Sequence, residues 1–83
     1  MSRIEWRQDS VAGVALRRYV GFVGAIEVGN VAYDGGNKFW VWATPLAEDA
    51  WGWGPTEQAA KQAVELWLKG WLQNFQAFFP DRH

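Results

Sequence analysis

A single long amphipathic segment, Pro55–Phe79, constrains most strongly what this chain can fold into. Its apolar side chains recur at the i, i+3, i+4, i+7 spacing of one helical face. They are Ala60, Ala63, Val64, Trp67, Leu68, Trp71, Leu72, Phe75, Phe78 and Phe79. Thr56 is a good N-cap, Glu57 complements the dipole of the first turn, and Pro80 cannot continue a helix. The sequence therefore predicts one C-terminal helix over residues 56–79.

This predicted helix is longer than the strands that the remaining chain can supply. About 23 helical residues span ~35 Å, whereas a strand of about six or seven residues covers ~20–23 Å. The distal end, Trp71 to Phe79, is therefore expected to pack on something other than the sheet. Loops of the same chain or a partner can cover it. We favour a partner, because the Phe side chains of the last turns would otherwise form an exposed apolar patch.

Before the helix, the chain reads as a series of strands. Apolar and charged residues alternate from Arg3 to Gln8, which is typical of an antiparallel strand with one solvated face. Strands are predicted over residues 3–8, 14–20, 22–28 and 38–44. Strands followed by one helix predict an α+β fold in a single domain, residues 1–83. Its sheet is an antiparallel meander of three or four strands, with the helix packed on one face.

Turn and loop signals separate these strands. Gly21 allows a tight turn, and Gly24 suggests a bulge or a close backbone approach. The best turn signal is Asp34–Asn37, which reads Asp-Gly-Gly-Asn. Pro45–Pro55 contains the Trp-Gly-Trp-Gly run of residues 51–54 and is predicted to be a loop that delivers the chain to the helix.

The strand predicted over residues 38–44 is apolar on both faces, with Phe39 and Val41 on one and Trp40 and Trp42 on the other. If the helix covers Phe39 and Val41, the two indoles stand ~7 Å apart on the open face. There they can stack on bases, sugars or the aromatic side chains of a partner. In the reverse orientation the indoles pack beneath the helix as core, which buries the larger area. Either way one apolar face remains, and this favours a partner.

The composition argues against an enzyme. The chain has no Cys, and its only His is the last residue, His83, so the usual nucleophile–base pairs cannot be built. Glu48 and Asp49 are the only local pair of acids that catalysis or ligand binding could use. We expect no catalytic residues, no cofactor and no metal site. With no signal-type apolar region and no membrane-length apolar run, the expected location is the cytoplasm.

Seven Trp and five Phe are more than a core of this size can hold, so some are expected to serve an interface. The predicted function is therefore a non-enzymatic protein–protein interaction module, either a homodimer or a small inhibitor that docks on another protein. The predicted interface residues are Trp40, Trp42, Trp71, Phe75, Phe78 and Phe79.

The alternative function is nucleic-acid binding through an aromatic sheet face. Its candidate residues are Arg3, Arg7, Arg17, Arg18, Trp40 and Trp42. A net charge of −1 disfavours this alternative. The adjacent residues Arg17 and Arg18 must also point to opposite faces of their strand, which prevents a contiguous positive surface.

The segment GWGPTEQAAKQAVELWL, after the strand FWVWA, resembles the strand-to-helix join of the small three-stranded DNA-binding domains at the N-terminus of phage-type integrases. In that family the sheet lies in the major groove, and a Thr-capped helix with an Ala-Lys pair like Ala60-Lys61 backs it. The resemblance covers about half of the chain and implies a βββα shape and DNA binding. The chain departs from the family where basic and polar strand residues would read DNA, because Phe39, Trp40 and Val41 stand there.

In its size and Trp content the chain also resembles short single-domain proteins of phages and proteobacteria. Some of those proteins inhibit host defence complexes, and this resemblance implies a small phage-type inhibitor that docks on a host protein complex.

Overall fold

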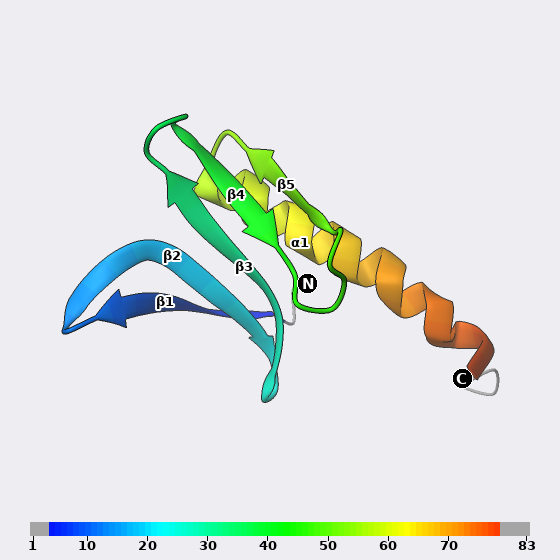
Figure 1. Cartoon of the computed structure of the whole chain (residues 1–83). Helices are drawn as coiled ribbons and strands as arrows, with labels where there is room; N and C mark the ends of the chain where they lie inside the picture. The colour runs from blue at the N-terminus through cyan, green and yellow to red at the C-terminus, as the bar shows by residue number, and fades with distance from the viewer. Residues whose placement is uncertain (1–3, 79–83) are drawn as a thin grey trace.

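The computed structural model describes residues 4–78, which form one antiparallel sheet with one helix across a single face (Figure 1). The strands are β1 (Glu5–Val11), β2 (Val14–Val23), β3 (Ile26–Asp34), β4 (Phe39–Ala43) and β5 (Trp51–Gly54). The helix α1 (Glu57–Leu72) continues into a 3-10 segment, η1 (Gln73–Phe78). The five strands lie in the sheet in chain order, so the predicted α+β class and meander are confirmed. The meander has one strand more than predicted, because β5 lies where a loop was expected.

The turn between β2 and β3 lies at Gly24, not at Gly21, so the prediction of a strand over residues 22–28 was wrong at both ends, since β3 spans Ile26–Asp34. Gly24 has φ +61°, the left-handed conformation that suits glycine in a tight hairpin turn. Gly21 lies inside β2, opposite Trp6 of β1. A Cβ atom there would meet Ile4 Cγ2 at 2.7 Å and Trp6 Cζ3 at 3.0 Å. Gly21 is therefore a point of close packing, not a turn.

The predicted turn at Asp34 is confirmed. The Lys38 N–H donates to the Asp34 carbonyl at 2.7 Å, which closes the hairpin between β3 and β4. The Asp34 carboxylate accepts from the backbone N–H groups of Gly36 at 3.0 Å and Asn37 at 3.2 Å, and from the Asn37 side-chain amide at 3.0 Å. These bonds, led by the one from the Asn37 amide, hold the pKa of Asp34 below its ordinary value.

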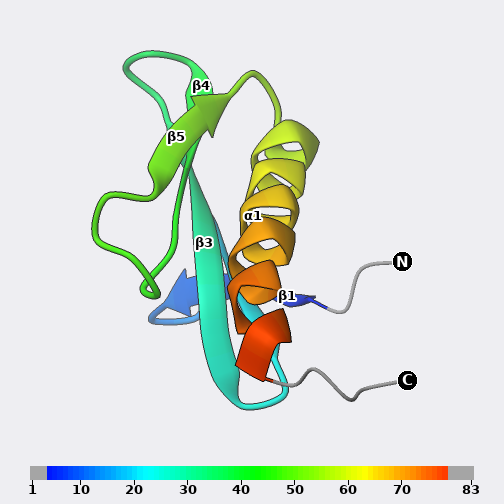
Figure 2. The same cartoon turned by 90° about the vertical axis from the view of Figure 1, so that its right-hand side faces the viewer.

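The core lies between α1 and one face of the sheet, which Figure 2 shows as two layers. Strand register places Val31 opposite Trp42, and Tyr33 opposite Trp40, so these four side chains share that face. Trp40 is 7% exposed, and the side chain of Val64 on α1 is fully buried against the same cluster. Of the two orientations open from the sequence, the structure therefore adopts the one in which the indoles of β4 lie beneath the helix.

A side chain of the helix packs closely against the sheet at a glycine of β3. A Cβ atom on Gly29 of β3 would lie 2.5 Å from Val64 Cγ1 and 3.3 Å from the Ala43 carbonyl oxygen. Only a residue without a side chain leaves room for Val64 at this point. The contact sets the distance between the two layers.

The helix begins as predicted but ends earlier. The Thr56 hydroxyl accepts a hydrogen bond from the Ala59 N–H at 3.0 Å, which is the predicted N-cap. Leu68 is the last buried residue of α1, and the N–H of Gln73 turns back to the Gly70 carbonyl, three residues earlier, where the 3-10 segment starts. The predicted extent to residue 79 was therefore wrong for the α-helix, and Phe79 itself lies outside the described residues.

The physical reason is that strands support only the first part of the helix. α1 packs on β3, β4 and β5, whereas within the described chain η1 contacts α1 alone. Figure 1 shows the end of α1 and η1 extending past the strands. Without tertiary packing, a helix keeps little stability of its own.

Substituting Gly29 with Ala tests the contact between Val64 and β3. We expect G29A to lower the free energy of unfolding by about 1–3 kcal/mol, because the new methyl group overlaps Val64. The control G70A adds the same methyl group inside α1, where nothing lies within 4 Å of its position. G70A should raise stability by about 1 kcal/mol. Urea unfolding followed by Trp fluorescence measures both changes. Equal stability of G29A and the parent chain would contradict the packing.

The Asp34 turn predicts a pH dependence. Because the folded-state pKa of Asp34 lies below 3.8, its carboxylate stabilises the fold above that pH, and the contribution is lost as pH falls through the folded pKa. Replacing Asn37 with Ala removes the largest cause of the shift, so the pKa of Asp34 should rise toward 3.8. A carboxyl ¹³C titration measures it. In the control N74A, which changes an exposed Asn in η1, the Asp34 titration should not move.

Candidate functional site

Among residues 4–78, no helix or second sheet packs on the face of the sheet that points away from α1; we call it the open sheet face. Strand register arranges its side chains in two rows that cross the sheet. One row runs through Trp53, Val41, Ala32 and Arg18, and the other through Trp51, Ala43, Asn30, Val20 and Arg7. One end of this face, at β5, is therefore aromatic, and the other end, at β1 and β2, is charged.

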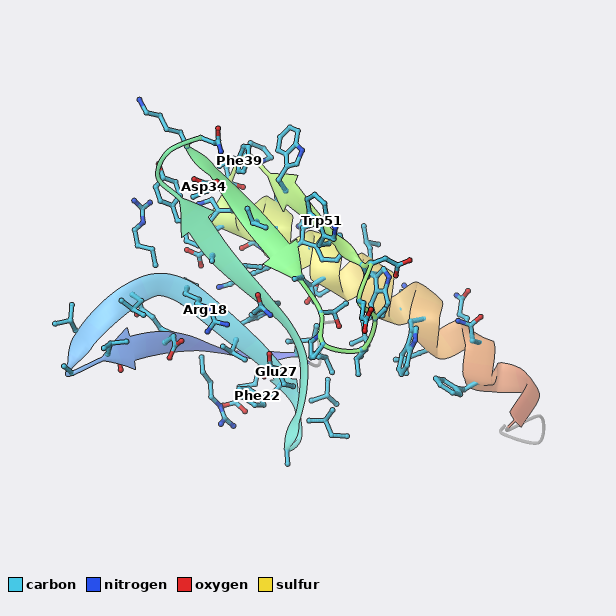
Figure 3. All side chains as sticks on the ribbon, in the orientation of Figure 1. Arg18, Phe22, Glu27, Asp34, Phe39 and Trp51 are labelled. Carbon is cyan, nitrogen blue, oxygen red and sulfur yellow. The ribbon has the colours of Figure 1, made fainter. Side chains whose placement is uncertain are left out.

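At the aromatic end, Trp51 and Trp53 of β5 are the most exposed indoles among the described residues, at 64% and 62%. The Phe39 ring of β4 stacks on Trp53, with ring centroids 5.3 Å apart and planes 22° apart. We call Phe39, Trp51 and Trp53 the aromatic edge patch. Figure 3 labels Phe39 and Trp51, which come from the neighbouring strands β4 and β5. A hydrophobic patch of this kind on a protein surface is typical of a binding site.

The strand that carries the patch forms because of its glycines. Gly52 and Gly54 occupy the helix-facing positions of β5, opposite Trp42 and Trp40. A Cβ atom on Gly52 would meet Trp42 Nε1 at 2.7 Å, and one on Gly54 would meet the Ala60 nitrogen at 3.1 Å. Because Trp and Gly alternate, β5 presents no side chain to the helix-facing side, where Trp42 and α1 already fill the space. The loop prediction missed this period-two signal.

The charged end of the open sheet face is internally paired. Arg18 forms an ion pair with Asp9 at 2.6 Å, and Arg7 forms one with Glu5 at 3.2 Å. The Arg7 guanidinium also lies over the Phe22 ring, 4.6 Å from its centroid. Both arginines thus have acidic neighbours, and no unbalanced positive surface results from them.

Of the described residues predicted for nucleic-acid binding, only Arg17 and Trp40 come together, with the guanidinium 5.7 Å from the centroid of the Trp40 ring. Arg17 lies on the helix side of the sheet, where its guanidinium is 3.8 Å from the centroid of the Tyr33 ring. Arg7 and Arg18 lie on the open sheet face, and Arg3 lies outside the described residues. Trp40 and Trp42, the predicted stacking platform, lie beneath α1.

The residues predicted for a protein interface divide into two groups. Trp40 and Trp42 belong to the core and its margin. Trp71 and Phe75 lie on the end of the helix, where Trp71 stacks on Trp67 at 5.9 Å and meets Phe75 edge-on at 4.9 Å. The side chain of Phe78 and the whole of Phe79 lie outside what the structure describes.

The helix end forms a second apolar surface. Leu72 is 51% exposed and Phe75 is 40% exposed. The ladder of Trp67, Trp71 and Phe75 stabilises this end from within the helix. This surface was expected from the sequence, whereas the aromatic edge patch was not.

A third cluster surrounds Lys61 on α1. Its ammonium pairs with Glu57 at 2.7 Å and lies 4.0 Å from the centroid of the Tyr19 ring and 5.5 Å from that of Trp6. The Lys61 side chain is 16% exposed, so its aliphatic part covers the margin of the core. The cluster joins the helix to β1 and β2, and every charge in it has a partner. Its role is structural.

Acidic side chains are the candidates for metal binding or catalysis in the described part of the chain. Across residues 4–78 no three His, Asp or Glu side chains gather as metal ligands would. Glu48 and Asp49 are exposed in the segment between β4 and β5. Within the same residues, no helix has the length and apolar character needed to cross a membrane.

Comparison of the chain with protein-family models, with curated proteins and with solved structures found no match. The function must therefore be argued from the surfaces themselves.

The Lys61 cluster yields a stability prediction. Replacing Lys61 with Ala should lower the free energy of unfolding by about 1 kcal/mol, because the cation–π contacts and the packing of its aliphatic chain are lost. The matched control is K69A, at an exposed position of the same helix, which should change stability by less than about 0.5 kcal/mol. Urea denaturation compares the two variants. If K61A and K69A behave alike, the cluster does not hold the helix to β1 and β2.

Proposed function

We propose that this chain is a non-enzymatic protein–protein interaction module that docks through aromatic surface. It acts either as a homodimer or as a small phage-type inhibitor on a host protein complex. The observation that carries the proposal is the exposure of Trp51 and Trp53, both above 60%, side by side on one face of the sheet. Tryptophan is the residue type most enriched among the hot spots of protein interfaces.

The helix end adds to this argument. Leu72 and Phe75 expose further apolar area on a segment that extends past the strands (Figure 1). A monomer that leaves two separate apolar surfaces in water has a large hydrophobic gain available from association. Both surfaces therefore fit a protein that works by contact.

Nucleic-acid binding is the weaker reading. Binding to phosphates requires several lysines or arginines on one contiguous surface. Here Arg7 and Arg18 are paired with acids, Arg17 lies on the other face, and the indole of Trp40 is buried. The exposed indoles of Trp51 and Trp53 lie at the opposite end of the open sheet face from Arg7 and Arg18.

Photo-cross-linking tests the proposed function directly. We expect a chain with p-benzoylphenylalanine at position 51 to form covalent adducts in bacterial cells, because the probe replaces an aromatic side chain at the docking surface. The control places the same probe at Val14, a hairpin residue with the same 64% exposure as Trp51. Mass spectrometry of the adduct then identifies either a second copy or another protein.

A third and a fourth probe position, Leu72 and Phe75, cover the helix end. The proposal is contradicted if adduct yields at residues 51, 72 and 75 are no higher than at Val14, since exposure alone would then explain every adduct.

A further inference from the structure

The two edges of the sheet differ in how well they are protected against pairing with another strand. Edge strand β1 carries Glu5, Arg7 and Asp9 on the open sheet face, and its pairing with β2 shifts register between Gln8 and Ser10. Charged side chains and irregular register are the usual means of blocking an edge. The other edge strand, β5, reads Trp-Gly-Trp-Gly and has neither a charge nor a proline within it.

The outer edge of β5 is also free in the described residues. β5 pairs with β4 along its inner edge, and no other described strand lies beyond it. Its side chains leave the plane of the sheet on one side only, because the helix-facing positions are glycines. An unprotected edge strand with one apolar face is a template for strand addition.

We propose that β5 pairs antiparallel with β5 of a second copy of this chain, about a two-fold axis at Gly52 that stands perpendicular to the sheet. This inference rests on the proposed function and specifies its homodimer form. The two five-stranded sheets then become one ten-stranded sheet, with both helices on the same face. The axis makes the contact isologous, so the assembly closes at two copies.

Strand parity selects the register. Residues directly opposite each other in an antiparallel pair point to the same face of the sheet. The open face is therefore continuous only if the axis sets one residue opposite its own copy in the partner. An axis at Trp53 would set Trp51 opposite Pro55, which has no N–H to donate. An axis at Trp51 would set Trp53 opposite Asp49. Only the axis at Gly52 sets each Trp opposite a Trp.

In this register Trp51 lies opposite the partner's Trp53, and the pair occurs twice. Directly opposite Cβ atoms of an antiparallel pair are about 4.5–5.5 Å apart, within reach of aromatic stacking. Because Phe39 already stacks on Trp53, the two aromatic edge patches join into one band. The net charge of −1 per chain gives little repulsion between copies.

A second copy fits this edge better than the strand of an unrelated protein. A strand added to β5 extends the aromatic edge patch if it carries aromatic side chains on the open sheet face, and adds no bulk beside α1 if it carries glycines on the other face. β5 itself has this pattern, with Trp51 and Trp53 on one side and Gly52 and Gly54 on the other.

Disulfide trapping tests the register in which β5 pairs with β5 of the second copy. The chain contains no Cys, so the single variants Trp51→Cys and Trp53→Cys each introduce one thiol. An oxidised mixture of the two variants should give a cross-linked dimer in high yield, because residue 51 lies opposite residue 53 of the partner. Each variant oxidised alone should give little. Equal or higher yield from either variant alone overturns the axis at Gly52.

Sedimentation equilibrium from about 1 to 100 µM tests whether the dimer forms through Trp51 and Trp53. The parent chain should approach twice its 9.5 kDa mass. The double variant Trp51→Lys and Trp53→Lys should weaken the dimer about 30-fold or more, as loss of a hot-spot tryptophan does. Its control, Val11→Lys with Val14→Lys, changes equally exposed residues at the β1–β2 turn and should leave the dimer intact. Circular dichroism checks that all variants are folded.

A third double variant, Leu72→Lys with Phe75→Lys, separates this inference from the proposed function. A dimer that survives lysines at Trp51 and Trp53 but dissociates with lysines at Leu72 and Phe75 overturns pairing through β5. The chain is then still an interaction module. A strict monomer at ~100 µM without cross-links also overturns the β5 dimer. Docking on another protein is then decided by the photo-cross-linking experiment.

Discussion

The packing of α1 on the Trp40 and Trp42 face of β4 is the interaction on which the rest of the structure depends. Val64 reaches the backbone of β3 through the gap that Gly29 leaves, and Val31 and Val64 are completely buried between the layers. Burying one such aliphatic side chain contributes roughly 1.5–3 kcal/mol. A wide indole beside a short aliphatic residue fills the space between a helix and a sheet without a cavity. Once α1 covers the face of β4 that carries Trp40 and Trp42, the opposite face, which carries Phe39, must remain on the outside.

The distribution of the aromatic residues follows from this choice. A chain of 83 residues buries only about 60–65% of its unfolded surface, so seven indoles cannot all lie in its core. Trp6, Trp40 and Trp42 pack in or against the core, and Trp67 and Trp71 stack on each other along the helix. The indoles of β5 are left at the edge of the sheet, where glycines hold their backbone against the core. Exposure of this pair is thus a consequence of the fold, and we propose that it serves association.

The sheet is asymmetric in charge as well as in shape. Ion pairs gather at β1 and β2, whereas the aromatic edge patch occupies β4 and β5. Exposed ion pairs contribute little to stability, but charges on an edge strand make pairing with another strand unfavourable. One edge therefore resists association and the other permits it. This asymmetry makes association through a single edge possible without open-ended growth of the sheet.

Local patterns in the sequence determined much of the fold. The 3.6-residue recurrence of apolar side chains specified the helix, Thr56 specified its start, and the hydrogen-bonding capacity of Asp34 and Asn37 specified a turn. Each of these depends on neighbours within a few residues, so a linear sequence contains the information. The absence of Cys and of an internal His likewise needs no structure to be read.

Only the tertiary structure decided which face of β4 is buried, because that strand is apolar on both faces and alternation gives no preference. It also decided that residues 51–54 form a strand: their Trp-Gly alternation has the period of a strand, but glycine disfavours strands, and the packing of Trp42 and Ala60 against Gly52 and Gly54 gives the glycines their place. The end of α1 was decided in the same way, by where the strands below it stop. These outcomes depend on contacts between segments far apart in the chain, and such contacts exist only after the layers have packed.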